Sequence, residues 1–149
     1  MIKIHVRAIV PTENAYVLMG DRDKNDQETW DLPGGELKAG IDVKEHLRQL
    51  VLENTGYSIV NLNFFEVTCK IKPRTRGQDP VTIIDFIFSS KPEATELKPA
   101  AKETQLLPFA KFEWLESAGR FQQNKVMNLL TRYHRLYVAV EDSSPASSL

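Results

Sequence analysis

The feature that most constrains the fold is a short helix whose two ends are both marked in the sequence. Asp42 occupies an N-cap position and Glu45 follows three residues later, which is the spacing of a capping box. Gly56 stands where a helix commonly ends in a left-handed residue. One apolar stripe recurs at helical spacing between these ends, formed by Val43, Leu47, Leu50 and Val51. The pattern predicts an amphipathic helix over residues 42–55 that packs one face on another layer.

Strand patterns lie on both sides of this helix. Residues 2–10 alternate like a half-buried strand, and residues 62–71 alternate again. Residues 81–88 are nearly all apolar, which is typical of a strand covered on both faces. A short strand is expected at 112–115, and a helical period runs from about residue 121 to residue 140. The interleaved order predicts an α/β fold with a mixed sheet covered by helices.

The alternation within residues 62–71 also predicts which side chains share a face. Phe64 is expected on the face of Glu66 and Lys70. Val67 and Ile71 are expected on the opposite face. The segment that follows, residues 72–80, is basic and is expected to be a loop.

Length and charge limit the domain organisation and the function classes. A chain of 149 residues fits one domain, which we place at residues 1–141, and the Ser-rich residues 142–149 are expected to form a disordered tail. The formal net charge of −1 argues against a nucleic-acid binder, which normally carries a basic surplus. No apolar run approaches the length of a membrane span. Cys69 is the single cysteine, so no internal disulfide can form and a cytoplasmic location is expected.

The residues around the helix carry a family resemblance. The turn at residues 30–35 (Trp-Asp-Leu-Pro-Gly-Gly) and the helix that ends before Gly56 resemble the Nudix family of MutT-like hydrolases. The spacing of the family signature is preserved without a gap from Gly35 to Gly56. The resemblance implies an α/β/α sandwich with a mixed central sheet in a single domain. It also implies hydrolysis of nucleoside diphosphates linked to another moiety, with Mg²⁺ or Mn²⁺ as cofactor.

The charged positions of the signature are mostly replaced in this chain. Where the family carries its first Glu and its Arg, the chain has Ile41 and Gln49. The family carries three further Glu residues on the helix. Two of these positions are Leu50 and Asn54 in this chain, and only Glu53 remains a glutamate. The resemblance implies that Glu53 is both the catalytic residue and the metal ligand. Because Mg²⁺ is usually held by carboxylates, we expect the hydrolytic activity to be weakened or lost. The alternative is a non-catalytic module that binds a nucleotide or a protein partner.

Candidate ligand-binding residues lie in two segments. The main-chain N–H groups of Gly34 and Gly35 are suited to a phosphate. Basic side chains alternate along the extended segment at Lys70, Lys72, Arg74 and Arg76. Arg74 and Arg76 are candidates to bind a diphosphate, since guanidinium groups match phosphate oxygens. The alternative is a solvated hairpin edge protected by charge.

Several other polar residues were open to more than one interpretation. Asp85 is expected either at the rim of the sheet or facing a cleft. The three histidines show no metal-site spacing and are expected on the surface: His5, His46 and His134. Loop acids that could replace the missing metal ligands are Asp31, Glu36, Glu93, Glu96 and Glu103. A homodimer is possible if excess apolar surface is exposed, for example on the C-terminal helix.

Overall fold

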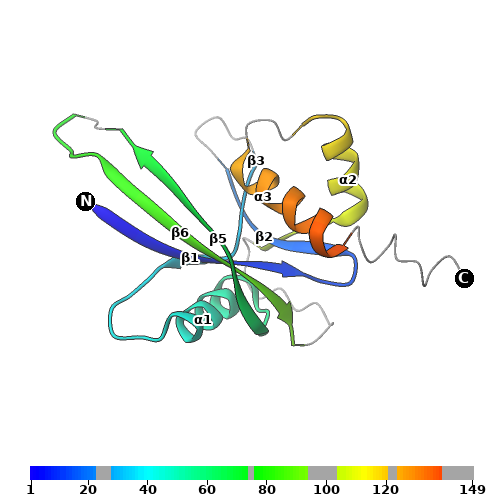
Figure 1. Ribbon diagram of the computed structural model, residues 1–149, viewed down its shortest axis with the longest axis horizontal. Helices are drawn as coiled ribbons and strands as arrows, with labels where there is room; N and C mark the ends of the chain where they lie inside the picture. Colours follow the sequence, from blue (N-terminus) through cyan, green and yellow to red (C-terminus); the bar gives the residue numbers. More distant parts are fainter. Residues whose placement is uncertain (23–27, 74–75, 94–103, 121–123, 139–149) are drawn as a thin grey trace, which may run out of the picture. The chain divides into compact units, whose positions relative to one another are not determined.

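The computed structural model describes residues 1–22, 28–73, 76–93, 104–120 and 124–138 (Figure 1). The strands are β1 (Ile2–Pro11), β2 (Ala15–Arg22), β3 (Glu28–Asp31), β4 (Gly34–Glu36), β5 (Ile59–Lys72), β6 (Val81–Pro92) and β7 (Thr104–Pro108). The helices are α1 (Val43–Thr55), α2 (Phe109–Ser117) and α3 (Lys125–Tyr133), which continues into the π-helical turn η1 (His134–Val138). The chain forms two compact units, residues 1–108 and the segment from Phe109 onward, which are described separately.

The strands of the first unit form the mixed sheet that the sequence predicted. The strand order is β3-β2-β1-β6-β5, with β4 paired to β1 and β7 paired to β2. The pairing of β1 with β6 is parallel, and the other pairings are antiparallel. The sequence patterns did not predict strand β7, in which Leu107 is fully buried opposite Tyr16 of β2.

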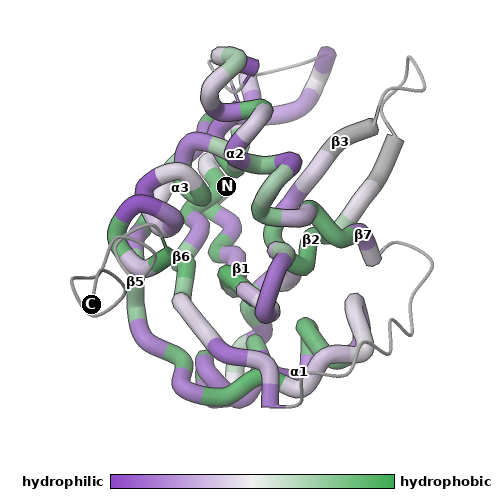
Figure 2. The backbone as a smooth tube through the Cα atoms, turned by 90° about the vertical axis from the view of Figure 1, so that its right-hand side faces the viewer, coloured by the Kyte–Doolittle hydropathy of each residue, from purple (hydrophilic) through white to green (hydrophobic). Residues whose placement is uncertain are grey.

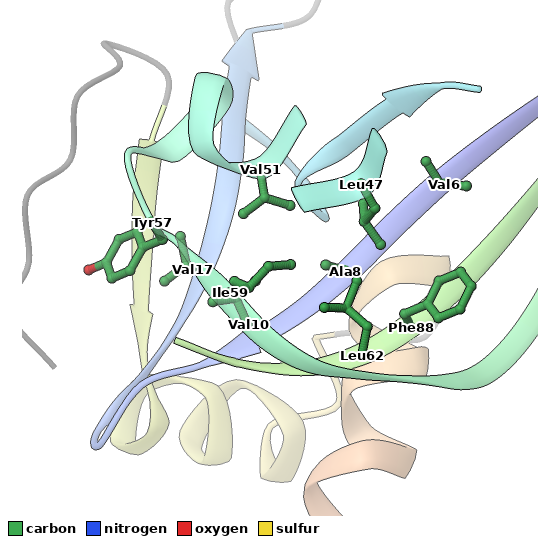
Figure 3. Packing of buried hydrophobic residues seen from close by; sticks show 10 residues of the cluster. All are labelled: Val6, Ala8, Val10, Val17, Leu47, Val51, Tyr57, Ile59, Leu62 and Phe88. Atoms are coloured by element: carbon green, nitrogen blue, oxygen red, sulfur yellow. The ribbon is translucent and has the colours of Figure 1, made fainter. Parts of the chain in front are cut away.

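Helix α1 begins and ends where the sequence predicted. The side chain of Asp42 accepts a hydrogen bond from the main-chain N–H of Glu45 at 3.1 Å, and Gly56 closes the helix with φ +79°. The apolar stripe of α1 covers one face of the sheet. The buried cluster contains Leu47 and Val51 of the helix together with Val6, Ala8, Val10, Val17, Tyr57, Ile59, Leu62 and Phe88 (Figure 3).

The long strand β5 shows alternating hydropathy (Figure 2), but one predicted face assignment is wrong. The register between β5 and β6 shifts between Phe64 and Glu66, because a bulge adds one residue there. As a result Phe64 lies on the same face as Val67, and its ring contacts those of Phe86 and Phe88. The neighbouring β6 is also less covered than predicted: Ile83 and Ile87 are buried, but alternate residues on its other face are partly exposed.

The second unit corrects one further prediction. Residues 112–115 lie within helix α2 and do not form a strand. Phe109 and Phe112 are one helical turn apart, and both rings contact the ring of His134, at centroid distances of 5.3 and 5.1 Å. Helix α3 is capped by Asn124 and lies inside the predicted range of 121–140. The predicted tail at 142–149 lies outside the described residues.

Candidate functional site

The two adjacent glycines lie in a short strand directly beside β1. Gly34 pairs with Arg7 and Gly35 with Val6, so the segment expected to be a turn adopts strand geometry as β4. Gly34 has φ +149°, and a Cβ there would overlap the carbonyl oxygen of Val6. Only glycine fits this approach of two main chains. The site is therefore built on a main-chain contact that admits no side chain.

The C-terminal half of α1 packs on this glycine strand. The Asn54 amide nitrogen, Nδ2, donates a hydrogen bond to the carbonyl oxygen of Gly34 at 2.9 Å. Both methyl groups of Leu50 lie 3.5 Å from the position that a Cβ on Gly35 would take. Helix positions 50 and 54 thus face the glycines, and Leu50 covers Gly35 with hydrocarbon. Thr104 fixes the same end of the helix, because its hydroxyl donates to the main-chain oxygen of Asn54 at 3.1 Å.

An arginine on β1 supports the chain that leads into the glycines. Arg7 Nη1 donates to the carbonyl oxygen of Leu32 at 3.1 Å, and Nη2 lies 3.6 Å from a carboxylate oxygen of Asp31. Arg7 Nε lies 3.6 Å from Asp85, whose side chain is only 13% exposed. The carboxylate of Asp85 is therefore an internal partner of Arg7. It helps to position the Arg7 side chain that contacts Leu32 and Asp31.

His5 completes this charged group. His5 Nδ1 lies 3.6 Å from Asp85 and 3.4 Å from Arg7 Nη2. Burial lowers the pKa of His5 below 6.5, and the Arg7 charge lowers it further, whereas Asp85 acts in the opposite direction. His5 is therefore held mainly in its neutral form near pH 7.

The one remaining acidic residue of the signature is exposed. Glu53 is exposed on α1, between Leu52, which is also exposed, and Asn54. In the described part of the chain no three His, Cys, Asp or Glu side chains gather in a group that could hold a metal ion. The helix thus presents Leu50 and Asn54 to the glycines and leaves Glu53 in solvent.

Comparison with known proteins identifies the family that this geometry belongs to. The family model described as the NUDIX domain matches residues 1–130. The chain belongs to the NUDIX family. A sequence comparison with curated proteins finds no match. The family acts on small nucleotide derivatives and generally uses divalent metal ions.

Solved structures share the fold at low sequence identity. A NUDIX hydrolase from Nitrosomonas europaea is similar with a TM-score of 0.64 and 18% identity, over 91% of this chain and 90% of that one. A MutT protein from Bacillus halodurans has a TM-score of 0.56 and 18% identity, over 76% and 72% of the two chains. A UDP-X diphosphatase has a TM-score of 0.54 and 18% identity, over 74% and 52%. Such identities support a common NUDIX fold.

The acids that could replace the missing ligands are engaged elsewhere or lie apart. Asp31 accepts from the Leu32 N–H at 2.8 Å besides its ion pair, and Glu93 accepts from the Ser58 hydroxyl at 2.7 Å. Glu36 is exposed at the end of β4. Glu96 and Glu103 lie outside the described residues. Within the described chain no acid therefore completes a carboxylate cluster with Glu53.

Among the described residues, the donor set around the NUDIX helix does not fit a divalent cation. Mg²⁺ needs near-octahedral oxygen ligation with carboxylates among its ligands. Leu50 supplies none, and the Asn54 amide directs its N–H, not its oxygen, at the carbonyl of Gly34. The exposed Glu53 is a single carboxylate. Positions 50 and 54, which carry Glu in the family signature, thus form a packed, hydrogen-bonded contact.

The predicted basic residue Arg76 lies away from the glycines. Gly34 shares a row of the sheet with Arg7 and Ile87. Arg76 is exposed in the turn beyond the end of β5, where Lys72 pairs with Val81. Along β6, Val81 and Ile87 are six residues apart, so the turn and the row of Gly34 are separated by about 20 Å at roughly 3.3 Å per residue. The structure therefore does not bring Arg76 beside Gly34, and Arg74 lies outside the described residues.

Two histidines expected on the surface are buried instead. His46 of α1 is 4% exposed, and its Nε2 lies 3.0 Å from the carbonyl oxygen of Glu36. Since a carbonyl oxygen only accepts, Nε2 carries the hydrogen. His46 follows Val43 by three residues and precedes Leu50 by four, so the helical period already placed it beside the apolar stripe. His134 is 3% exposed and its Nε2 lies 3.0 Å from Glu113.

Proposed function

We propose that this NUDIX protein binds a small nucleotide derivative beside the glycine strand and hydrolyses pyrophosphate linkages weakly or not at all. The observation that carries the proposal is the hydrogen bond from Asn54 to the Gly34 carbonyl. A glutamate at position 54 would set an anionic acceptor against a carbonyl acceptor, and a cation between the two would be needed to make that contact favourable. The amide supplies the positive N–H end itself. The contact is complete without an ion.

Leu50 supports the same conclusion. Its methyl groups lie against Gly35 and form part of the packing around the buried cluster. A carboxylate in that place would lose hydration unless a cation compensated it. The two replacements therefore act together: one removes a ligand and fills its space, and the other converts a ligand into a hydrogen-bond donor.

The family supports the choice of ligand. NUDIX proteins act on small nucleotide derivatives, and two similar structures are named a MutT protein and a UDP-X diphosphatase. We place Gly34 and Gly35 in the ligand site, with Glu53 at its rim. Arg74 and Arg76 remain candidate ligand residues. Because Arg76 lies away from the glycines, only a long substrate would reach both Arg76 and Gly34.

Three further predictions stay with this proposal. The domain is placed at residues 1–141, somewhat beyond the NUDIX match, which ends at residue 130. A cytoplasmic location is supported by Cys69, which is exposed and is the single cysteine. Among the described helices, none is long and apolar enough to cross a membrane. The formal net charge of −1 favours a small-molecule ligand over nucleic acid.

The test compares binding with turnover in the same preparations. Nucleotide sugars, dinucleotides and nucleoside triphosphates are titrated by calorimetry without metal, and release of phosphate or nucleotide is measured with Mg²⁺ and with Mn²⁺. The proposal expects saturable binding by at least one class and turnover that is absent or unchanged in Glu53→Gln. Glu45→Gln is the matched control, because it removes an exposed carboxylate from the other end of α1.

The competing function is a working hydrolase in which Glu53 holds the metal. Efficient metal-dependent turnover that Glu53→Gln abolishes and Glu45→Gln preserves would establish that function and overturn the proposal. The double variant Leu50→Glu, Asn54→Glu sharpens the comparison. If missing carboxylates limit the activity, this variant gains metal-dependent turnover over the wild type.

A further inference from the structure

One end of the sheet extends beyond the helix that covers it. Helix α1 buries Val6 and Ala8 completely, but Ile2 and Ile4 of the same face of β1 are 68% and 37% exposed. Figure 1 shows the N-terminal end of β1 and the paired ends of β5 and β6 projecting past α1. Three strands thus continue without the helical layer that the rest of this face has.

The uncovered part of the sheet is apolar across all three strands. The register places Ile2, Thr82 and Ile71 in one row, and Ile4, Ile84 and Cys69 in the next. The third row ends at Val67, which is 48% exposed, and Phe64 beyond it is 57% exposed. We call this surface the open face: Ile2, Ile4, Phe64, Val67, Cys69, Ile71, Thr82 and Ile84. It contains no charged side chain.

The polar residues of these strands lie on the reverse of the sheet. Lys3 and His5 alternate with the open-face residues of β1, and Lys70 and Lys72 alternate with those of β5. Strands β1 and β5 are therefore amphipathic here, and their apolar side is the side that lacks cover. An exposed contiguous apolar patch of this kind is often an interaction surface.

The β5 edge of the sheet is protected, whereas the open face is not. Strand β5 ends the strand order, but Lys70 and Lys72 stand on it and its register shifts twice, between Val60 and Asn63 and again after Phe64. Lysines and bulges are the usual devices against edge-to-edge pairing. A partner is therefore expected to pack on top of the open face and not to extend the sheet at β5.

A second copy of this chain meets that requirement. Five open-face residues are 37–68% exposed, which corresponds to about 500 Å² per copy, so two copies that bury this surface fully would cover about 1,000 Å², the lower limit of a specific interface. Packed sheets lie about 10 Å apart, which matches the thickness of a helix layer. The partner's strands would therefore fit beside α1, in the layer that α1 occupies. A net charge of −1 adds little repulsion between copies.

We propose that two copies associate through their open faces, sheet on sheet, across a twofold axis. The interface is isologous, so each copy contributes the same rows of Ile2, Ile4 and Ile71. Its small area predicts a weak dimer that forms with rising concentration. The inference does not depend on whether the NUDIX site turns over substrate.

The test measures mass against concentration by sedimentation equilibrium, from about 10 μM to about 1 mM, for the full chain. The wild type is expected to pass from monomer to dimer in this range. Ile2→Lys and Ile71→Lys are each expected to weaken association at least tenfold, since each places two charges in the apolar interface of a dimer. Leu52→Lys is the matched control, because Leu52 is 51% exposed on α1 outside the open face, and it should leave the dimer unchanged.

The pair of variants separates this dimer from the alternatives. Ile2 lies on β1, two strands away from the β5 edge, so a dimer paired along β5 would respond to Ile71→Lys alone. That result would overturn the proposal, as would a wild type that stays monomeric throughout or a dimer that neither variant weakens. Circular dichroism and melting temperature confirm that each variant is folded, which is expected because both side chains are 68% exposed.

Discussion

Replacing Asn54 with aspartate tests whether an amide has taken the place of an ion. The substitution keeps the shape of the side chain but exchanges the donor that faces the Gly34 carbonyl at 2.9 Å for an acceptor. Loss of the hydrogen bond costs about 1 kcal/mol, and the unsatisfied carbonyl facing a charge adds about 1–2 kcal/mol. Position 54 is in the last turn of α1, where a negative charge adds about 0.5 kcal/mol. The expected loss is about 3 kcal/mol, a fall in Tm of about 6–12 °C at this size.

The same variant should respond to divalent cations when the wild type does not. A cation placed between the new carboxylate and the carbonyl would restore an attractive contact, so Mn²⁺ or Mg²⁺ should raise the Tm of Asn54→Asp. Asn54→Ala is the control, because it removes the donor without adding a ligand and should be destabilised with no recovery by metal. The measurement is Tm by differential scanning calorimetry with and without metal. An Asn54→Asp variant as stable as the wild type, or a wild type that metal stabilises equally, would refute the reasoning.

Three further predictions address the surroundings of the site. Gly34→Ala should prevent stable folding, because a Cβ would overlap the main chain of β1, whereas Gly40→Ala, at φ +85° in open space, should cost only about 1 kcal/mol; soluble yield and chemical denaturation compare them. Tyr57→Phe should leave stability equal or raise it by up to about 1 kcal/mol, since the buried hydroxyl has no hydrogen-bond partner in the described structure and burial raises its pKa; a loss beyond 1 kcal/mol would contradict this. The pKa of His5 is lowered on folding, so its contribution to stability is present above pH 6.5 and is lost as pH falls through the folded pKa; Tm should therefore decline less between about pH 8 and about pH 5 in His5→Gln than in the wild type, and equal declines would exclude His5 as the cause.

The helix of the NUDIX signature was predictable because its determinants are local. The Asp42 cap, the apolar period and Gly56 act over four residues or fewer, and each is visible in the sequence. The helical period also predicts that His46 is buried, so the expectation of a surface position was wrong. Local patterns thus fixed both the helix and the face that it turns toward the sheet.

The elements that were misjudged depend on contacts distant in sequence. Residues 104–108 form a strand by pairing with β2, almost ninety residues earlier in the chain. No local pattern within the segment predicts this pairing. Residues 112–115 are apolar but too few to separate a strand from a helix by period alone. The bulge between Phe64 and Glu66 shifts one residue in the register and so reverses the face of Phe64. That shift places Phe64 with Val67 on the open face.

The candidate site combines the spacing of the family signature with altered chemistry, and the two have different physical origins. The spacing from Gly35 to Gly56 is required by packing, since Gly34 must approach Val6 and the helix must reach the glycines. Charge at positions 50 and 54 is not required for that packing. Leu50 fills the space against Gly35, and Asn54 bonds the carbonyl that faces it.

We therefore expect the fold of this NUDIX domain to be stable without the ion that the family generally uses. Clustered carboxylates repel one another and are tolerated when a cation and a reaction require them. A domain that has exchanged two of them for a hydrocarbon contact and a hydrogen bond gains stability and gives up ligands. The single substitution Leu50→Glu should therefore lower the Tm in metal-free buffer. A higher Tm in that buffer would show that the packing of Leu50 against Gly35 does not stabilise the domain.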